Sequence, residues 1–265
     1  AIFRAIELNG VAINGNKQSF NWGRIAATDM ALVEKSLPHP VKSDRLLHEL
    51  DDIVTHRANY LTSYQDQKLA DKYVSAVNNI RNLEKELDFG TQELAKSVAR
   101  NYFKLLAIKD EYEVARLYTN GEFERKINQQ FEGDFKIHFH MAPPLLARKN
   151  SKGHLQKMEF GGWMFKTLKL VARCRGLRGT ALDIFGRTSE RKMERKLARD
   201  YESLLQDFNK SLCQGNYDIA LELATIPADI RGFGHVKEKS VELAQKKATE
   251  LLKKFHSRDR LKKVA

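Results

Sequence analysis

The side chains best suited to chemistry in this sequence are arginines that could bind an anion. They lie in a segment that also carries glycine and aromatic residues, and they are Arg173, Arg175, Arg178 and Arg187. A guanidinium group is planar and offers its donors in a fixed fork, which suits carboxylate and phosphate groups. The segment therefore predicts contact with an acidic protein, a phosphorylated ligand, anionic lipid or nucleic acid.

A second candidate for anion binding follows Arg231, where two glycines precede His235. Such a glycine pair can turn backbone amides toward an anion, and an imidazole at this position could titrate near neutral pH. The alternative is a turn between two helices that requires a positive φ, for which glycine is the usual residue. We prefer the turn, and we keep Arg231 and His235 as candidates.

His138 and His140 are two residues apart in a segment with strand-like alternation, so their rings would share one face. Imidazole pairs with this spacing occur in metal sites. No cysteine lies near them, and the spacing identifies no third ligand. We therefore interpret them as polar residues of a strand face, and we expect this chain to bind no metal.

The two cysteines, Cys174 and Cys213, form no CxxC motif and cannot build a disulfide scaffold. Arginines beside Cys174 would favour its thiolate, which is the nucleophilic form, whereas single cysteines are usually small buried hydrophobic residues. The sequence also has none of the motifs GxGxxG, GxxxxGK[ST], HExxH and GxSxG. It predicts no free-standing enzyme, and it indicates a reducing compartment such as the cytoplasm.

The formal net charge of +12 is concentrated in two parts of the 265-residue chain. Residues 148–200 contribute +10 and residues 236–265 contribute +6, while the remainder is slightly acidic at −4. In the terminal part, an exposed helix face explains the lysines as well as a partner does. The central part mixes arginine with aromatic residues, so it is the better candidate for a partner surface.

The elements that must position these residues are mostly helices. Apolar residues recur every three or four positions over 43–87, 94–108, 193–212 and 241–255. Residues 119–122 have the capping-box spacing, with Thr119 as the N-cap residue of a further helix. The predicted fold class is mainly α, a multi-helix domain with long amphipathic helices and a small β element near 134–142, where apolar and polar residues alternate.

The composition, with 42% hydrophobic and 30% charged residues, excludes collagen-like and wholly disordered classes. No run of about 18 apolar residues is present, so we expect neither a membrane span nor a membrane partner. The chain begins in the middle of an apolar pattern, which indicates part of a longer polypeptide. The expected divisions are the tail of a preceding domain at 1–27, a linker at 28–42, a helical domain at 43–257 and a basic tail at 258–265.

Several strings resemble the C-terminal region of one enzyme family. The end of the gamma-type domain of 2-oxoacid:ferredoxin oxidoreductases is similar to NGVAI (9–13) and WGR (22–24). The C-terminal domain of the single-chain indolepyruvate ferredoxin oxidoreductases is similar to KDEYEVARLY (109–118), FEGD (131–134), APPLLAR (142–148), LRGT (177–180), DIFG (183–186), ERKMER (190–195) and IRGFGHVKE (230–238). The strings follow the family's order over nearly the whole chain.

The resemblance implies that the whole enzyme oxidatively decarboxylates an aryl or branched 2-oxo acid to its acyl-CoA and passes the electrons to ferredoxin. It also implies thiamine diphosphate and [4Fe–4S] clusters in the remainder of the polypeptide. This chain lacks the Gly-Asp-Gly string for thiamine diphosphate and has too few cysteines for a cluster, so we expect it to bind neither. No catalytic residue of the family can be assigned to a position here.

The expected role is therefore scaffolding, contact within a homodimer of the whole enzyme, or docking of ferredoxin. Ferredoxins are typically acidic, so the basic segment 148–200 would attract them. One alternative is a basic helical module that binds nucleic acid, with an affinity that falls steeply with salt. Another is a self-contained enzyme that uses Cys174 or His235, which predicts a bound cofactor or activity in the purified chain.

Overall fold

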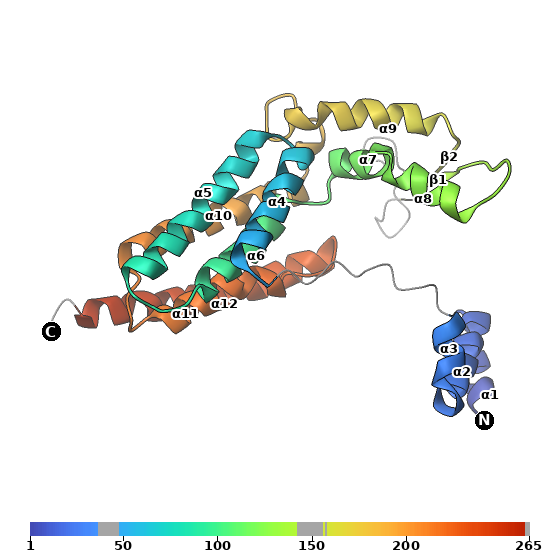
Figure 1. Cartoon of the computed structure of the whole chain (residues 1–265), viewed down its shortest axis with the longest axis horizontal. Helices are drawn as coiled ribbons and strands as arrows, with labels where there is room; N and C mark the ends of the chain where they lie inside the picture. The colour runs from blue at the N-terminus through green and yellow to red at the C-terminus, as the bar shows by residue number, and fades with distance from the viewer. Residues whose placement is uncertain (37–47, 142–155, 157, 263–265) are drawn as a thin grey trace. The chain divides into compact units, whose positions relative to one another are not determined.

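The structure is a computed structural model that describes residues 1–36, 48–141, 156 and 158–262 (Figure 1). It divides into two units, residues 1–47 and residues 48–265. Helices predominate and one small antiparallel sheet is present, so the predicted mainly α class is confirmed. No helix within the described ranges is long and apolar enough to cross a membrane.

The first unit contains three helices, which are α1 (Ile2–Asn9), α2 (Ile13–Thr28) and α3 (Met30–Ser36). Both α1 and α3 contact α2, and none of the three helices has a buried residue. Of the predicted linker at 28–42, Thr28 ends α2 and residues 30–36 form α3. The Asp29 carboxylate accepts a hydrogen bond from the Leu32 amide (3.0 Å), a local cap that starts this helix. Residues 37–42 of the predicted linker lie outside the described residues.

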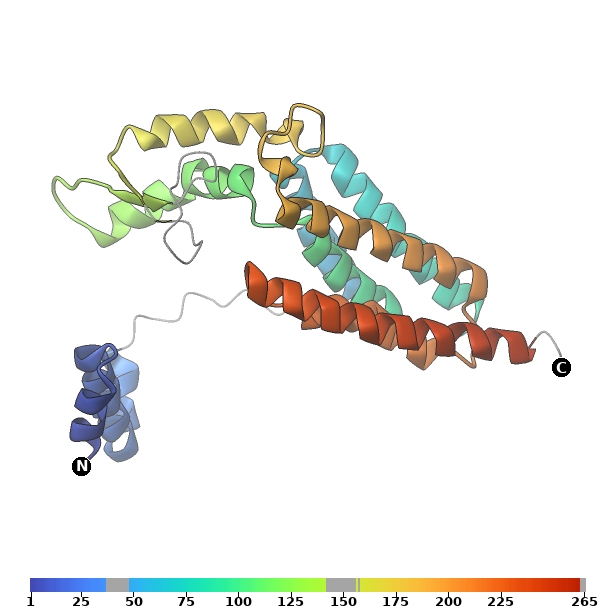
Figure 2. The ribbon, with the colours of Figure 1, turned by 180° about the vertical axis from the view of Figure 1, so that it is seen from behind.

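Most helices of the second unit form a bundle, and these are α4 (Leu50–Tyr64), α5 (Gln67–Glu86), α6 (Glu93–Leu106), α10 (Ser189–Ser211), α11 (Tyr217–Thr225) and α12 (His235–Lys262). In this bundle α5 contacts α4, α6 and α10, while α11 contacts α6 and α12. Both ribbon views show α10 beside α5 and α12 along α11 (Figure 1, Figure 2). Residues 258–262 of the predicted basic tail are the end of the helix α12, which continues through residue 262.

The part of the periodic stretch over 43–87 that the structure describes forms two helices, and one residue explains the break between them. Asp66 has an extended backbone, with φ −163° and ψ 172°, and its carboxylate accepts a hydrogen bond from the Leu69 amide (2.8 Å). An N-cap of this kind satisfies an amide that the first turn leaves without a partner. The chain therefore ends α4 at Tyr64 and begins α5 at Gln67.

Stacked tyrosines fill the centre of the bundle. The rings of Tyr73 on α5 and Tyr201 on α10 both stack on Tyr102 of α6, with centroid separations of 6.2 and 5.9 Å. All three side chains are buried, and burial raises the pKa of each hydroxyl. The Tyr73 hydroxyl donates to the Ala99 carbonyl (3.0 Å) and the Tyr201 hydroxyl to the Ala224 carbonyl (2.9 Å), so neither polar end is left unsatisfied.

A buried carboxylate joins three helices of the bundle. Glu84 of α5 is 1% exposed and accepts hydrogen bonds from the Leu94 amide (2.9 Å) and the Ala95 amide (3.0 Å) at the start of α6. It also accepts one from the Tyr217 hydroxyl of α11 (2.7 Å). A side chain from α5 thereby caps α6 and holds α11 beside it.

The titration of Glu84 makes the stability of this bundle depend on pH. Burial raises the pKa of the carboxyl above its usual 4.5 and outweighs the lowering by its three hydrogen bonds. A raised pKa in the folded state stabilises the fold below pH 4.5, and this contribution is lost as the pH rises through the folded pKa. We expect the unfolding free energy of the parent chain to fall relative to Glu84→Gln over that rise, as denaturant titrations at pH 4.5 and pH 8 would show. A difference that stays constant with pH would contradict this.

The remaining elements of the second unit form a lobe with its own apolar core. We call it the α7–α9 lobe, and it comprises α7 (Glu111–Thr119), α8 (Glu122–Gln130), β1 (Phe139–Met141), β2 (Met158–Phe160) and α9 (Met164–Arg173). The two strands are antiparallel, with Phe139 opposite Phe160. Both rings are buried against α9 residues that include Met164 and Leu168. The predicted β element is confirmed, although β1 is only three residues long.

The predicted capping box at residues 119–122 is wrong. Thr119 is the last residue of α7, and its hydroxyl donates to the Ala115 carbonyl (2.7 Å). The next helix has Gly121 as its N-cap, in the left-handed region at φ 85°. The Glu122 amide donates to the side-chain oxygen of Asn120 (3.0 Å), so Asn120 accepts from the first turn of this helix in place of Thr119.

Candidate anion-binding site

The α7–α9 lobe is joined to the bundle by a buried ion pair between Arg178 and Asp110. The guanidinium donates from Nε to Oδ2 (2.5 Å) and from Nη2 to Oδ1 (2.9 Å), and the two side chains are 9% and 4% exposed. Arg178 also donates to the Tyr64 carbonyl (2.9 Å) and lies 3.8 Å from the centre of that ring. The prediction that Arg178 faces a partner is wrong, because its donors are occupied inside the protein.

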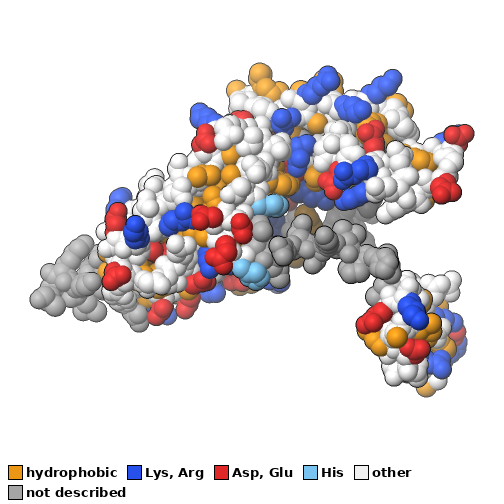
Figure 3. All heavy atoms as spheres, in the orientation of Figure 1, with side chains coloured by type: hydrophobic (Ala, Val, Ile, Leu, Met, Phe, Trp, Pro, Cys, Tyr) orange, Lys and Arg blue, Asp and Glu red, His pale blue; other side chains and the backbone are white. Residues whose placement is uncertain are grey.

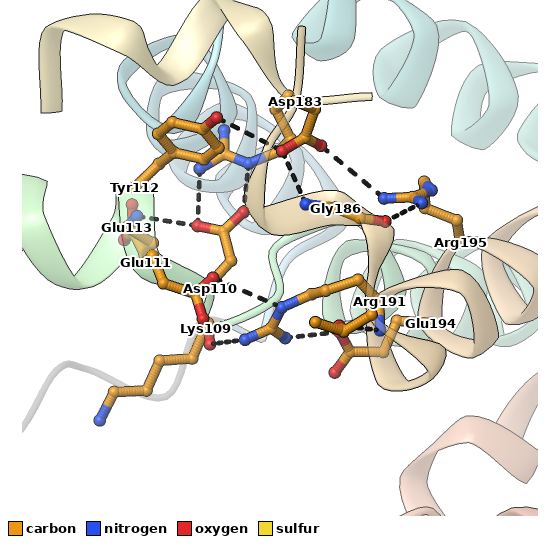
Figure 4. Close-up of polar contacts among 12 residues, drawn as sticks. Lys109, Asp110, Glu111, Tyr112, Glu113, Asp183, Gly186, Arg191, Glu194 and Arg195 are labelled. Atoms are coloured by element: carbon orange, nitrogen blue, oxygen red, sulfur yellow. Dashed lines mark hydrogen bonds and ion pairs between the residues drawn. The ribbon is translucent and has the colours of Figure 1, made fainter. Parts of the chain in front are cut away.

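The Asp110 carboxylate has two partners at this junction. Besides binding Arg178, its carboxylate accepts a hydrogen bond from the Glu113 amide (2.8 Å) and so caps α7 (Figure 4). Arg178 follows the short 3-10 helix η1 (Cys174–Leu177), which continues from the end of α9. One carboxylate therefore fixes the start of α7 and the chain that leaves α9.

Asp183 fixes the loop after η1. Its carboxylate accepts hydrogen bonds from the amides of Gly179 and Gly186 (both 2.8 Å) and from the Tyr112 hydroxyl (3.3 Å) (Figure 4). A Cβ atom on Gly186 would lie 2.1 Å from the Asp183 carboxylate, so only glycine fits there. Arg187, which ends η2 (Phe185–Arg187), is exposed and donates to a backbone carbonyl of this loop (3.1 Å).

Two further acidic residues complete the junction on the α10 side. Glu194 is buried and pairs with Arg191 (2.6 Å) and with Lys237 of α12. Arg191 also donates to the Lys109 carbonyl (3.2 Å) and lies 3.7 Å from Glu111, whose pKa is raised by burial (Figure 4). Acids and bases here are matched to each other, so the arrangement is suited to holding elements together rather than to binding an external charge.

A pocket of about 560 Å³ on the α7–α9 lobe has the opposite character, because its charged lining residues are all cationic. We call it the basic pocket, and its cationic side chains are Arg116, Lys169, Arg173 and Arg175. They come from α7, α9 and η1, and the end of α4 contributes Ser63. The structure thus brings together two arginines predicted from sequence, Arg173 and Arg175, and adds two cations that sequence reasoning missed.

The cations of the basic pocket differ in how far they are neutralised. Arg116 pairs with Glu113 (2.7 Å) and lies 5.1 Å from the centre of the Tyr60 ring. Within the described ranges, no carboxylate lies within ion-pair distance of Lys169, Arg173 or Arg175. Arg175 is half-buried, and its Nε atom is buried without a hydrogen-bond partner in the described part of the chain. A buried donor without a partner is unfavourable until something accepts from it.

The second predicted anion site is a turn. Gly232 and Gly234 have φ values of 91° and 54°, which supports the interpretation as a helix-to-helix turn that needs glycine. Arg231 is exposed, and its amide donates to the Ser240 hydroxyl (3.0 Å). His235 begins α12, and its side chain lies outside the described residues.

The histidines and cysteines singled out from sequence are not grouped into a site in the described structure. His138 lies 2.5 Å from the Glu159 carboxylate, and His140 stands opposite Glu159 in the sheet. Among the described residues, no group of three or more His, Cys, Asp and Glu side chains could hold a metal ion. Cys213 is buried and Cys174 is half-buried at the start of η1.

No curated protein and no solved structure matches this chain. One family does match, over residues 50–250, a range that includes the basic pocket and the Arg178–Asp110 junction. It is described as a family of unknown function, DUF6537, and because the match covers most of the sequence, the chain belongs to this family.

Proposed function

We propose that this chain is the C-terminal part of an indolepyruvate-type 2-oxoacid:ferredoxin oxidoreductase, and that its helical domain docks an acidic electron carrier of the ferredoxin type. The observation that carries the docking proposal is the surface of α9. Lys166, Lys169 and Arg173 recur at helical spacing on one face and are all exposed. The helix has no acidic residue, and basic side chains gather along it in Figure 3.

The positions of the resembling strings support the assignment to the oxidoreductase. KDEYEVARLY supplies Asp110, LRGT supplies Arg178, and DIFG supplies Asp183 and Gly186. ERKMER supplies Glu194 and its partner Arg191. These four strings therefore contain residues that join the α7–α9 lobe to the bundle, so a protein with the same strings has the means to build the same junction.

The first unit also supports a place within a larger protein. Its apolar side chains are largely exposed, among them Ile2 (53%), Leu8 (73%) and Trp22 (47%). Exposed apolar surface of this kind is typical of an element that packs against further protein. In the proposal, this unit completes a preceding domain, and thiamine diphosphate and the iron–sulfur clusters belong to other parts of a cytoplasmic homodimeric enzyme.

The physical basis of docking is electrostatic attraction. A basic face raises the association rate of an acidic partner, and salt screens the effect over a Debye length of about 8 Å at 0.15 M ionic strength. Exposed cations at the edge of an interface act mainly by raising the association rate, and their replacement leaves the fold intact. The docking of ferredoxin should therefore depend on charge at α9 and on salt.

The test is a binding titration of ferredoxin against the intact chain at 20 and 300 mM NaCl. We expect the double variant Lys166→Glu/Arg173→Glu to weaken binding at least about tenfold at low salt, with little difference at high salt. Arg187→Glu, an exposed reversal outside α9, is the matched control and should change the affinity by no more than about twofold. Equal losses in both variants, or none in either, would refute docking at α9.

The nucleic-acid alternative rests on Trp163, which is 61% exposed beside the start of α9 and could stack on a base. It predicts binding of single-stranded DNA or RNA at about 50 mM salt, with an affinity that falls steeply with salt. Binding of this kind, together with no measurable affinity for ferredoxin, would replace the docking proposal.

A further inference from the structure

We infer that the basic pocket binds the phosphate group of a small phosphate monoester. The inference does not require the chain to be part of an oxidoreductase, although the basic pocket shares Lys169 and Arg173 with the α9 face. The basic pocket lies where the last turns of α4, α7 and α9 meet, at Ser63, Thr119 and Arg173.

The simplest explanation of cations at this place is that they offset helix dipoles. A helix C-terminus carries the equivalent of about −0.5 of an elementary charge, so three of them contribute about −1.5. Lys169, Arg173 and Arg175 contribute three positive charges, whereas Arg116 is balanced by Glu113. About +1.5 remains after the dipoles are offset, so the dipoles alone do not account for the cations. An anion of charge between about −1 and −2 would neutralise the pocket.

The hydrogen-bond donors of the basic pocket fit phosphate oxygens. The buried Nε of Arg175 has no acceptor within the described residues, and the guanidinium groups of Arg173 and Arg175, which line the pocket, supply donors for ligand oxygens. Asn120 uses its side-chain oxygen on the Glu122 amide (3.0 Å), which leaves its amino group free to donate toward the pocket that it lines. Guanidinium groups bind both carboxylate and phosphate with two parallel hydrogen bonds, and the three terminal oxygens of a phosphate monoester can be shared among more donors than the two oxygens of a carboxylate.

The size of the basic pocket indicates an ester rather than a free ion. Its volume of about 560 Å³ is within the range of small-molecule sites and leaves room for an organic group beside the phosphate. The apolar part of the lining includes Ala172 of α9. The charge of a phosphate monoester approaches −2 above its second pKa of about 6, which matches the charge that remains in the pocket.

The test is calorimetric titration of the intact chain with glycerol 3-phosphate at pH 5.0 and pH 7.5. We expect a dissociation constant below about 1 mM at pH 7.5 and about tenfold weaker binding at pH 5.0, because protonation removes the dianion. Sulfate, which keeps its charge over this range, should bind equally at both pH values. No heat with 10 mM ester at pH 7.5 would overturn the inference, as would affinity independent of the ester's charge.

Matched variants identify the pocket as the place of binding. Arg175→Gln and Arg173→Gln should each lower the affinity for the ester at least about fivefold. Lys166→Gln, on α9 but outside the basic pocket, should change the affinity for the ester by no more than about twofold. Equal effects of Arg175→Gln and Lys166→Gln would show general charge attraction and overturn the site. Arg173 belongs to both the basic pocket and the α9 face, whereas Arg175 lies outside that face, so Arg175→Gln distinguishes loss of ester binding from loss of docking.

Discussion

Replacing Asp110 by alanine should lower the unfolding free energy of the helical domain by about 3 to 5 kcal/mol. The substitution leaves the Arg178 guanidinium buried without its carboxylate and removes the N-cap of α7. Removing one member of a buried ion pair costs this much because the remaining charge is not solvated, and loss of the cap adds to it. Urea denaturation followed by circular dichroism measures the change.

The controls for this prediction separate the ion pair from the cap. Asp110→Asn keeps an oxygen that can cap α7 but removes the charge, so it should retain part of the stability. Arg187→Ala removes an exposed arginine and should change the unfolding free energy by less than about 0.5 kcal/mol. If Asp110→Ala is no more destabilising than Arg187→Ala, the junction does not hold the lobe to the bundle.

Replacing Glu84 by alanine should destabilise the bundle by a similar amount, about 3 to 5 kcal/mol. The Ala95 amide and the Tyr217 hydroxyl would lose their acceptor, and the Leu94 amide would keep only its longer hydrogen bond to the Tyr217 hydroxyl (3.3 Å). Each buried group without a partner costs about 1 to 3 kcal/mol. Glu86→Ala on the same helix is exposed and should have an effect below about 0.5 kcal/mol. Equal denaturation midpoints for Glu84→Ala and Glu86→Ala would show that α6 does not depend on this cap.

The helices were predictable from sequence because amphipathic spacing is local. The apolar stripe over 193–212 matches α10 closely, since every third or fourth residue faces the core regardless of its partner. Helix ends were harder to predict from sequence, because the backbone geometry at the end of a helix decides which nearby side chain can form the cap. Thr119 had the right type and spacing, but Gly121 and Asn120 begin the helix instead.

The number of positive charges in the basic segment was predictable from sequence, but which of them pair with an acidic residue was not. The basic segment was evident, yet its arginines divide between two roles that depend on residues far away in sequence. Arg178 is neutralised by Asp110, 68 residues earlier, whereas Arg173 and Arg175 remain free of carboxylates in the described structure and join Arg116 at the basic pocket. Nothing in the local sequence distinguishes these arginines, because only the packing of α7 against α9 decides which of them meets an acid.

We propose that the α9 face binds an acidic electron carrier that serves a 2-oxoacid oxidoreductase. The most direct measurement is steady-state oxidation of indolepyruvate by an intact protein that contains this chain, with ferredoxin or methyl viologen as the electron acceptor. For Lys166→Glu/Arg173→Glu at low salt, we predict that kcat/KM for ferredoxin falls at least about tenfold while the rate with methyl viologen stays within about twofold. An equal loss with both acceptors, unchanged ferredoxin kinetics, or no oxidation by the parent protein would contradict the account.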